Sequence, residues 1–353
     1  MQFIEGGKAT IDDIHFDRMT EKDSTLLFIN VPRRASVTSF YMSATEVTNA
    51  EWKEFYQSKI ETIGYNEAET LFYPDMDTWV EGEKGYSFSP AMRNTYFSAE
   101  AFDNYPVVGI SWEQAQVYCK WKTNQLKELG LKLNTTFRLP TNKEWEYAAK
   151  GPEELYLEKD EYGRRLFSSL YPWKDWYFKS GSEYLANFGS ITDINGVGLK
   201  GYAEDDCLYS CHVGNYPPNS RGLYDMAGNV AEWVEDKGGI PIRYKNKIGV
   251  HKISEIDSVI TETKEKLNTD ELQDVSGYTE YLDQLVHDKK ILIKGDTRIV
   301  KGGSWDDGPV YLQIGSRQAM DKDHKSSRVG FRIAISYEEE LAKYCPKKDW
   351  KPE

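Results

Sequence analysis

Three segments of the chain place apolar residues three and four positions apart directly after a capping signal. Thr48, Ser111 and Thr141 each precede such a run and are followed three residues later by Glu or Gln. In this capping box, the hydroxyl and the longer side chain both satisfy backbone N–H groups of the first helical turn. The pattern predicts three helices with one core-facing stripe each, the second ending at Gly130 and the third at Gly151.

Short alternating runs of apolar and polar residues predict strands near both ends of the chain. Residues 26–32 and 37–42 form such runs before the first helix, and residues 298–303 and 329–335 form them near the C-terminus. Residues 151–222 instead mix Gly, Pro, Asn, Asp and aromatic residues. A long stretch of this kind is typical of irregular structure that is functional or held by a ligand.

Residues 238–298 differ from their surroundings, because they are rich in Lys, Glu, Asp and Thr and contain few aromatic residues. We therefore expect a single domain built from residues 1–237 and 299–340 and interrupted at 238–298 by an insertion or docking arm. Residues 341–353 are expected to form a C-terminal tail.

The composition excludes several classes of protein. The chain has 353 residues, with 57 Asp and Glu against 44 Lys and Arg, and its formal net charge of −13 argues against nucleic acid as a partner. Hydrophobic residues make up 39% and aromatic residues 14%, which is enough for a folded core. No apolar run approaches the roughly 18 residues of a membrane-spanning helix, so none is expected.

The first residues and the cysteines bear on the cellular compartment. Residues 1–7 lack a basic segment followed by an apolar one. Two interpretations remain open: a cytosolic protein, or a precursor from which a signal peptide has been removed. The cysteines are Cys119, Cys207, Cys211 and Cys345, too few for a disulfide scaffold. Cys119 falls on the second predicted helix, where a buried thiol is expected, while Cys207 and Cys211 form either a local disulfide or free thiols.

Four motifs follow one another along the chain. They are 105–112 (YPVVGISW), 137–149 (FRLPTNKEWEYAA), 222–233 (GLYDMAGNVAEW) and 302–305 (GGSW), closed by 330–332 (GFR). With these motifs the chain resembles the formylglycine-generating-enzyme (sulfatase-modifying factor) family from about residue 3 to 335, outside the insertion. The resemblance implies one irregular α+β domain related to C-type lectins, with little regular secondary structure.

The resemblance also carries an expectation about catalysis. Enzymes of this family oxidise a cysteine to formylglycine with two copper-binding cysteines after the Gly-Gly-Ser-aromatic motif. The matching positions here are Asp307 and Leu312. Copper(I) prefers thiolates, so we expect a pseudo-enzyme without copper. A second branch of the family holds non-haem iron on histidines, and the five histidines of this chain are too far apart for such a site.

Three further stretches, 71–79, 86–106 and 301–317, are similar to the gliding-motility lipoproteins of Bacteroidota, the J-type more than the K-type. This likeness implies a non-catalytic component of the type IX secretion and gliding-motility machinery, with other proteins of that machinery as partners. It also implies a lipid anchor at the periplasmic side of the outer membrane. No lipobox cysteine precedes Cys119, so the signal peptide and lipobox are expected to have been removed. The alternatives are a lectin-like ligand-binding receptor on the same scaffold and a residual oxidase.

Two structural calcium sites are implied by the family resemblance. The first set of ligands comprises Asn187, Phe188, Asp205 and Cys207. The second set comprises Asp225, Gly228, Val230 and Glu232. Phe188, Cys207, Gly228 and Val230 are expected to act through backbone carbonyls. Calcium takes six to eight such oxygens, and a long loop can wrap around the ion. Alternatively, these residues only cap turns and satisfy buried backbone groups.

We expect structural roles for the other polar and aromatic residues that could carry chemistry. We expect Asp306 and Asp307 to form a turn or a solvated pair rather than an acid/base pair, because adjacent side chains of an extended segment point in opposite directions. Arg317 and Arg332 are expected to form ion pairs or backbone contacts. Core packing is favoured over sugar stacking for seven tryptophans, Trp52, Trp112, Trp121, Trp145, Trp173, Trp233 and Trp305.

Overall fold

The computed structural model describes residues 1–11, 14–17, 27–30, 33–80, 89–151, 170–173, 178–180, 182–189, 191–192, 198–200, 204–238, 258, 260–265, 286 and 297–343. Most of the insertion and the tail after residue 343 lie outside these ranges, so the domain division stays a prediction. Within them, the helices are too short or too polar to cross a membrane.

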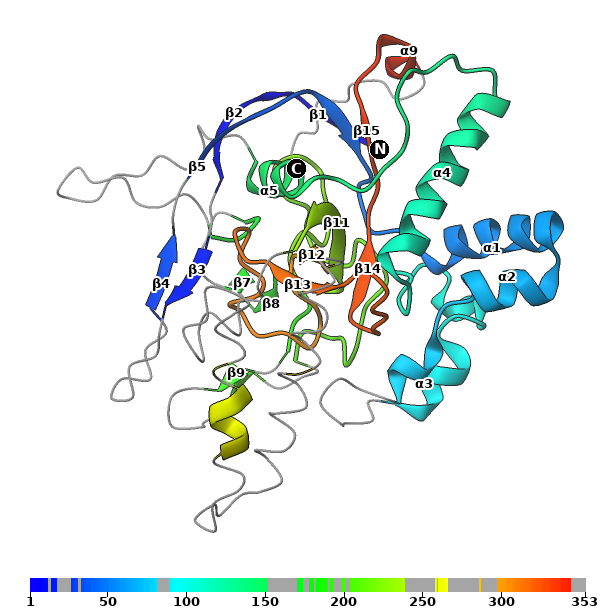
Figure 1. The fold of residues 1–353 in the computed structure, drawn as a ribbon. Coiled ribbons are helices and arrows are strands. Elements are labelled where there is room, and N and C mark those ends of the chain that lie inside the picture. The colour runs from blue at the N-terminus through cyan, green and yellow to red at the C-terminus, as the bar shows by residue number, and fades with distance from the viewer. Residues whose placement is uncertain are drawn as a thin grey trace.

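The strands of the N-terminal segment are short and antiparallel. β6 (Phe40–Met42) lies between β1 (Gln2–Ile4) and β15 (Ala334–Ser336), so both ends of the domain share one three-stranded sheet. Two further pairs are β2 (Gly7–Ile11) with β5 (Arg33–Val37), and β3 (Ile14–Asp17) with β4 (Leu27–Asn30). The β3–β4 pair lies on the opposite side of the molecule from α1 and α2 (Figure 1).

All three predicted helices are present, and each has the capping box that its sequence indicates. They are α1 (Asn49–Ile63), α4 (Trp112–Glu128) and α5 (Asn142–Lys150). The sequence pattern did not predict α2 (Tyr65–Phe72), α3 (Pro90–Thr95), α9 (Glu339–Ala342) or the 3₁₀ turns η1 (Met76–Trp79) and η2 (Glu100–Phe102). These elements are short, and a short element shows too few periods for its pattern to be recognised.

A four-stranded sheet with the order β13-β12-β11-β14 lies at the centre of the domain (Figure 1). Its strands are β11 (Ala231–Lys237), β12 (Thr297–Lys301), β13 (Gln318–Asp321) and β14 (Val329–Phe331). β14 runs parallel to β11, and the other neighbours are antiparallel. The insertion leaves and re-enters beside this sheet, since Gly238 N donates to Thr297 O at 2.8 Å. β12 begins two residues before the predicted boundary at 299.

The loop-rich region carries the shortest strands, in agreement with its irregular composition. β7 (Lys179–Ser180) pairs with β8 (Glu183–Tyr184), and β9 (Ile191–Thr192) pairs with β10 (Gly198–Lys200). Helices, strands of two to seven residues and long connections together confirm the irregular α+β fold expected from the motifs.

Stacked aromatic rings join the helices to the sheet. Trp52 of α1 stacks on Tyr118 of α4 at 5.6 Å between ring centroids and meets Phe331 of β14 edge-on at 5.9 Å. Such pairs add to the stability gained from burying the rings. Trp52, Trp145, Trp233 and Trp305 are buried, whereas Trp112, Trp121 and Trp173 are half-buried. Core packing is therefore confirmed for most of the tryptophan set. Cys119 is also buried, and burial raises the pKa of its thiol.

The first turn of α5 contains an ion pair whose contribution depends on pH. Arg138 donates to both carboxylate oxygens of Glu144 at 2.7 Å, and Glu144 also accepts from Thr141 N. Burial raises the pKa of Glu144, but the bonds and charge of Arg138 and the bonds from Thr141 outweigh burial and hold this pKa below its ordinary value of 4.5. Because the unfolded chain then binds the proton more readily, the stabilisation is present above pH 4.5 and is lost as the pH falls through the folded pKa.

We expect Glu144→Gln to lower the free energy of unfolding by about 1–3 kcal/mol at pH 7. The difference from wild type should shrink below pH 4.5, as measured by urea denaturation across pH. Glu51→Gln, in the equivalent capping box of α1, is the matched control and should cost under about 1 kcal/mol. A Glu144→Gln difference that does not change with pH would show that the charge of Glu144 contributes nothing.

Candidate functional site

Asn229 connects four segments that are far apart in the sequence. Its Oδ1 accepts from Cys211 N at 2.9 Å, its Nδ2 donates to Glu46 Oε1 at 3.0 Å, and its backbone N donates to Asn187 O at 2.8 Å. Its carbonyl accepts from Trp305 N at 2.8 Å. Asn229 is buried and has φ +57°, a left-handed conformation that asparagine tolerates better than most residues.

Neither Asn229 nor Glu46 was among the predicted site residues. The Gly228-Asn229 dipeptide is a turn signal in the sequence and is the feature that marks Asn229. Nothing in the local sequence marks Glu46, whose importance comes from its long-range contacts.

The structure brings the two predicted calcium sets next to each other. Asn187 O, from the first set, accepts the hydrogen bond of Asn229, which follows Gly228 of the second set. Gly228 has φ +78°, and a Cβ there would lie 2.0 Å from Asn187 O. Glycine is therefore required at this position both for its backbone conformation and for the close approach of the two loops.

The first set offers oxygen atoms suited to a cation. Asn187 Nδ2 donates to Tyr209 O at 2.7 Å, whereas its buried Oδ1 accepts no hydrogen bond from any residue that the structure describes. Asp205 is buried, and its Oδ2 accepts a hydrogen bond from Phe188 N at 3.0 Å. The unsatisfied buried Oδ1 of Asn187 and the buried carboxylate of Asp205 are oxygen ligands of the kind that a hard cation such as Ca²⁺ takes. Phe188 itself is buried, and Cys207 is half-buried.

The second set is arranged around an arginine. Arg332 Nε and Nη2 donate to the two oxygens of Glu232 at 2.6 and 2.7 Å, and Trp145 Nε1 donates to the same carboxylate at 2.7 Å. Asp225 accepts from Gly214 N at 2.6 Å. Glu232 is thus an ion-pair partner in this arrangement, and its role as a calcium ligand stays a prediction, as does that of Asp225, Gly228 and the buried Val230. The expected structural role of Arg332 is confirmed.

The buried carboxyl groups of Glu46, Asp225 and Glu232 lie around the guanidinium group of Arg332. Burial raises the pKa of Asp225 to about 6, against the hydrogen bond from Gly214 and the charge of Arg332. Burial and the neighbouring Asp225 raise the pKa of Glu46 well above its ordinary value. The raised pKa values of Glu46 and Asp225 favour the neutral forms of both carboxyl groups, which limits the negative charge that the interior must hold beside Arg332.

No described group of three or more His, Cys, Asp or Glu side chains converges as a metal site would require. The predicted calcium sites do not need one, because half of their ligands are backbone carbonyls. Residues of the first set would supply amide and carboxylate oxygens, and a bound ion would hold the loops together without taking part in chemistry.

If Ca²⁺ binds at the first set, it should stabilise the folded protein measurably. At one hundred times the dissociation constant, Ca²⁺ should raise the free energy of unfolding by about 2.7 kcal/mol, and EDTA should remove this increment. Asp205→Asn is expected to abolish the response, and Asp206→Asn, at the neighbouring exposed residue, should keep it. Thermal unfolding with and without calcium tests this prediction, and an unchanged wild-type melting temperature would contradict it.

Residues 302–312 contain positions 307 and 312, where the family resemblance implies the two cysteines of the enzymes. Asp307 Oδ2 accepts from Ser304 N at 2.9 Å and from Ser304 Oγ at 2.7 Å, which closes a turn. Leu312 is 0% exposed and packs with Tyr171, Phe188 and Ala227. Asp306 pairs with Arg328 at 3.4 Å and is largely buried, so of the two expected alternatives, a turn or a solvated pair, the structure has the turn.

Cys207 and Cys211 form a disulfide, with their Cα atoms 5.8 Å apart. Of the two alternatives left open by the sequence, the structure thus has the disulfide. The loop that it closes contains Tyr209, whose ring packs against Trp305 at 5.3 Å and Trp79 at 5.5 Å.

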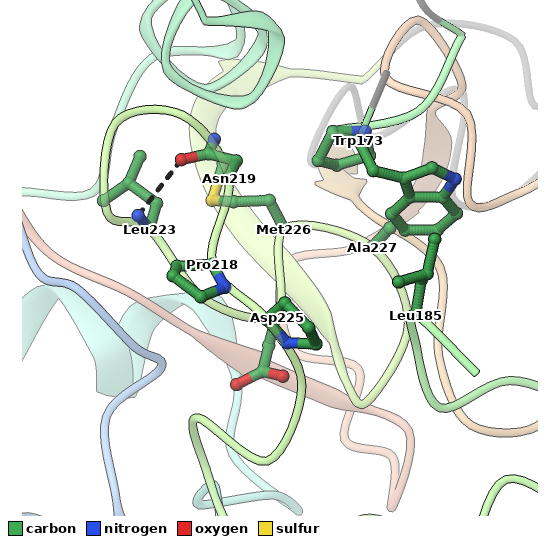
Figure 2. A pocket seen from close by; sticks show the side chains of 10 residues that line it. Trp173, Leu185, Pro218, Asn219, Leu223, Asp225, Met226 and Ala227 are labelled. Atoms are coloured by element: carbon green, nitrogen blue, oxygen red, sulfur yellow. Dashed lines mark hydrogen bonds between the residues drawn. The ribbon is translucent and has the colours of Figure 1, made fainter. Parts of the chain in front are cut away.

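A small cavity of about 50 Å³ lies beside the second set (Figure 2). Its walls include Trp173, Leu185, Pro218 and Met226, and Asp225 lies at its border. Asn219, in the same wall, accepts from Leu223 N at 3.1 Å, as the dashed line shows. The volume has room for a few water molecules or one small apolar group, which is too little for a cofactor.

The fold and this loop arrangement agree with the family comparison. The sulfatase-modifying factor enzyme 1-like domain matches residues 1–337, and the chain belongs to this family. The family includes enzymes and inactive members, so membership leaves catalysis open.

Relatives of both kinds are similar to the chain. The formylglycine-generating enzyme of Mus musculus is 27% identical over 219 residues, covering 58% of this chain and 50% of that protein. The enzyme of Streptomyces coelicolor is 35% identical over 135 residues, covering 38% of this chain and 32% of that protein. The inactive C-alpha-formylglycine-generating enzyme 2 of Bos taurus is 27% identical over 221 residues, covering 57% of this chain and 61% of that protein. The chain spans about half the length of the first of these relatives.

Solved structures share the fold at low sequence identity. Variable protein 1 of Treponema denticola has a TM-score of 0.50 and 20% identity, covering 96% of this chain and 95% of that one. PvdO from Pseudomonas aeruginosa has a TM-score of 0.51 and 17% identity, covering 95% of this chain and 93% of that one. At this identity the likeness concerns the fold alone.

Proposed function

We propose that this chain is a non-catalytic member of the family that serves as a structural or assembly component of the type IX secretion and gliding-motility machinery. Its place is the periplasmic face of the outer membrane, where a lipid anchor holds it and other proteins of that machinery are its partners. The proposal rests on the similarity of segments 71–79, 86–106 and 301–317 to the gliding-motility lipoproteins, and on the side chains at positions 307 and 312.

The observation that carries the non-catalytic part is the chemistry of Asp307 and Leu312. Asp307 is engaged by Ser304, and Leu312 is buried in an apolar cluster. Neither supplies the thiolate that copper(I) requires. The remaining described cysteines are otherwise engaged, Cys119 in the core and Cys207 with Cys211 in a disulfide. The existence of inactive relatives supports the same conclusion.

Two features support a location outside the cytosol. Disulfides such as Cys207–Cys211 persist in oxidising compartments, of which the periplasm is one. The first calcium set suits a compartment where a structural Ca²⁺ ion is available to replace missing regular structure.

The acidic net charge of −13 favours a basic or cationic partner surface over nucleic acid.

The non-catalytic part is tested by incubating the purified chain with copper(I) and a cysteine-containing peptide that active relatives oxidise. We expect no aldehyde by mass spectrometry, while the Streptomyces coelicolor enzyme forms it under the same conditions. Aldehyde formation by this chain would overturn the assignment.

The assembly role is tested by crosslinking in intact Bacteroidota envelopes that contain an epitope-tagged copy of the chain. We expect recovery of secretion-ring or gliding proteins, and the tagged Streptomyces coelicolor enzyme serves as a control of similar fold. A protein that stays free in solution without envelope partners would favour the alternative, a lectin-like ligand-binding receptor, and a glycan screen would follow.

A further inference from the structure

The Cys207–Cys211 disulfide has one face toward solvent and one toward the candidate site. Asp206 and Leu208 are exposed, Leu208 to 54%, and Cys207 is half-buried. Ser210 and Cys211, by contrast, are buried. A thiol reductant can therefore approach the disulfide through Cys207, while the loop's inner residues remain in contact with the site.

Inner contacts of this loop hold Asn187 of the first calcium set and Asn229, which lies between Gly228 and Val230 of the second set. Tyr209 O accepts from Asn187 Nδ2 at 2.7 Å, and Cys211 N donates to Asn229 Oδ1 at 2.9 Å. Immediately before the loop, Asp205 accepts from Phe188 N at 3.0 Å. The position of the 207–211 loop therefore fixes the orientation of Asn187 and Asp205.

The segment that enters the loop passes through a left-handed residue. Asp206 has φ +70°, a conformation that aspartate adopts more readily than most residues with a side chain. The disulfide fixes the next residue, Cys207, and so helps to hold this conformation. Because the closed ring spans only five residues, breaking it changes the entropy of the unfolded chain less than breaking a longer loop would, so we expect the effect of reduction to be mainly local.

We propose that the Cys207–Cys211 disulfide is a redox-sensitive clasp: its reduction by a dithiol releases residues 205–211 and loosens the first calcium set. The S–S bond breaks, each sulfur gains one electron and one proton, and the reducing dithiol becomes a disulfide. Oxidation by a disulfide reverses the step and restores the loop. This inference concerns the chain's own residues and does not depend on the proposed assembly role.

Hydrogen exchange tests the clasp. Exchange of the Phe188 and Cys211 amides is followed by mass spectrometry in the oxidised protein and after reduction with dithiothreitol. We expect at least a tenfold faster exchange at both amides on reduction, with no change in α4. In a parallel titration, Ca²⁺ should bind at least tenfold more weakly to the reduced protein.

The double variant Cys207→Ser/Cys211→Ser is the matched control. It should show fast exchange at Phe188 with or without dithiothreitol, because no disulfide remains to be reduced. Unchanged exchange in wild-type protein whose reduction is verified by mass would overturn the proposal. A disulfide that resists dithiothreitol in the folded protein, or reduction that accelerates exchange in α4 as well, would identify a purely structural crosslink.

Discussion

Replacing Arg332 with methionine is expected to lower the free energy of unfolding by about 3–5 kcal/mol. Arg332 is 0% exposed, pairs with Glu232, and donates to the carbonyls of Ser43, Ala44 and Tyr224. The variant leaves Glu232 without its counter-charge in an interior that already contains Asp225. Three backbone carbonyls also lose their donor, which adds an uncompensated desolvation cost.

Urea denaturation at pH 7 measures this loss, and two further variants make the result specific. Arg93→Met removes an exposed pair with Asp77, whose side chains are 51% and 50% exposed, and should cost under about 1 kcal/mol. Arg332→Met/Glu232→Gln removes both charges of the buried pair and should recover part of the stability. If Arg332→Met costs no more than Arg93→Met, the buried pair contributes little.

Gly228→Ala is expected to cost more than about 3 kcal/mol and to abolish the response to calcium. A Cβ at position 228 would lie 2.0 Å from Asn187 O, a contact that only movement of the backbone can relieve. The backbone that moves carries Asn187, so the first calcium set is displaced together with the packing. Thermal unfolding with and without Ca²⁺ reports both effects in one experiment.

Gly130→Ala separates the steric effect of Gly228→Ala from the backbone effect. Gly130, which follows α4 and donates its N–H to Lys127 O, has φ +84°, close to the φ of +78° at Gly228, but a Cβ there would meet nothing within 4 Å. This control carries only the cost of an alanine at positive φ, about 1 kcal/mol, and keeps the calcium response. Equal losses in the two variants would mean that the contact between Gly228 and Asn187 is not important.

Both experiments bear on the proposed function, because a non-catalytic member of this family needs its loops for shape and contacts. We expect the stability of the loop region to come from Arg332, Asn229 and the first predicted calcium set more than from regular secondary structure. If these groups are replaced, partner binding should fail together with loop order. A partner interface can therefore be studied only with variants that leave these three features intact.

Local chemistry in the sequence determined the three capped helices and the family. Thr48, Ser111 and Thr141 sit at their predicted caps, since a capping box acts within one helical turn and needs no tertiary contact. The motifs around Gly228 and Gly302 predicted the irregular α+β fold, and Asp307 and Leu312 are read directly from the chain.

Long-range contacts decided what the sequence could not. Asn229 meets Glu46 across 183 positions, and Arg332 meets Glu232 across 100, so no local pattern marks these partners. The choice between disulfide and free thiols at Cys207 and Cys211 likewise depended on how the backbone brings the two residues together. Capping and motif spacing act within a few residues, whereas the site is formed by buried polar groups that must find partners, and the fold alone determines which partners are within reach.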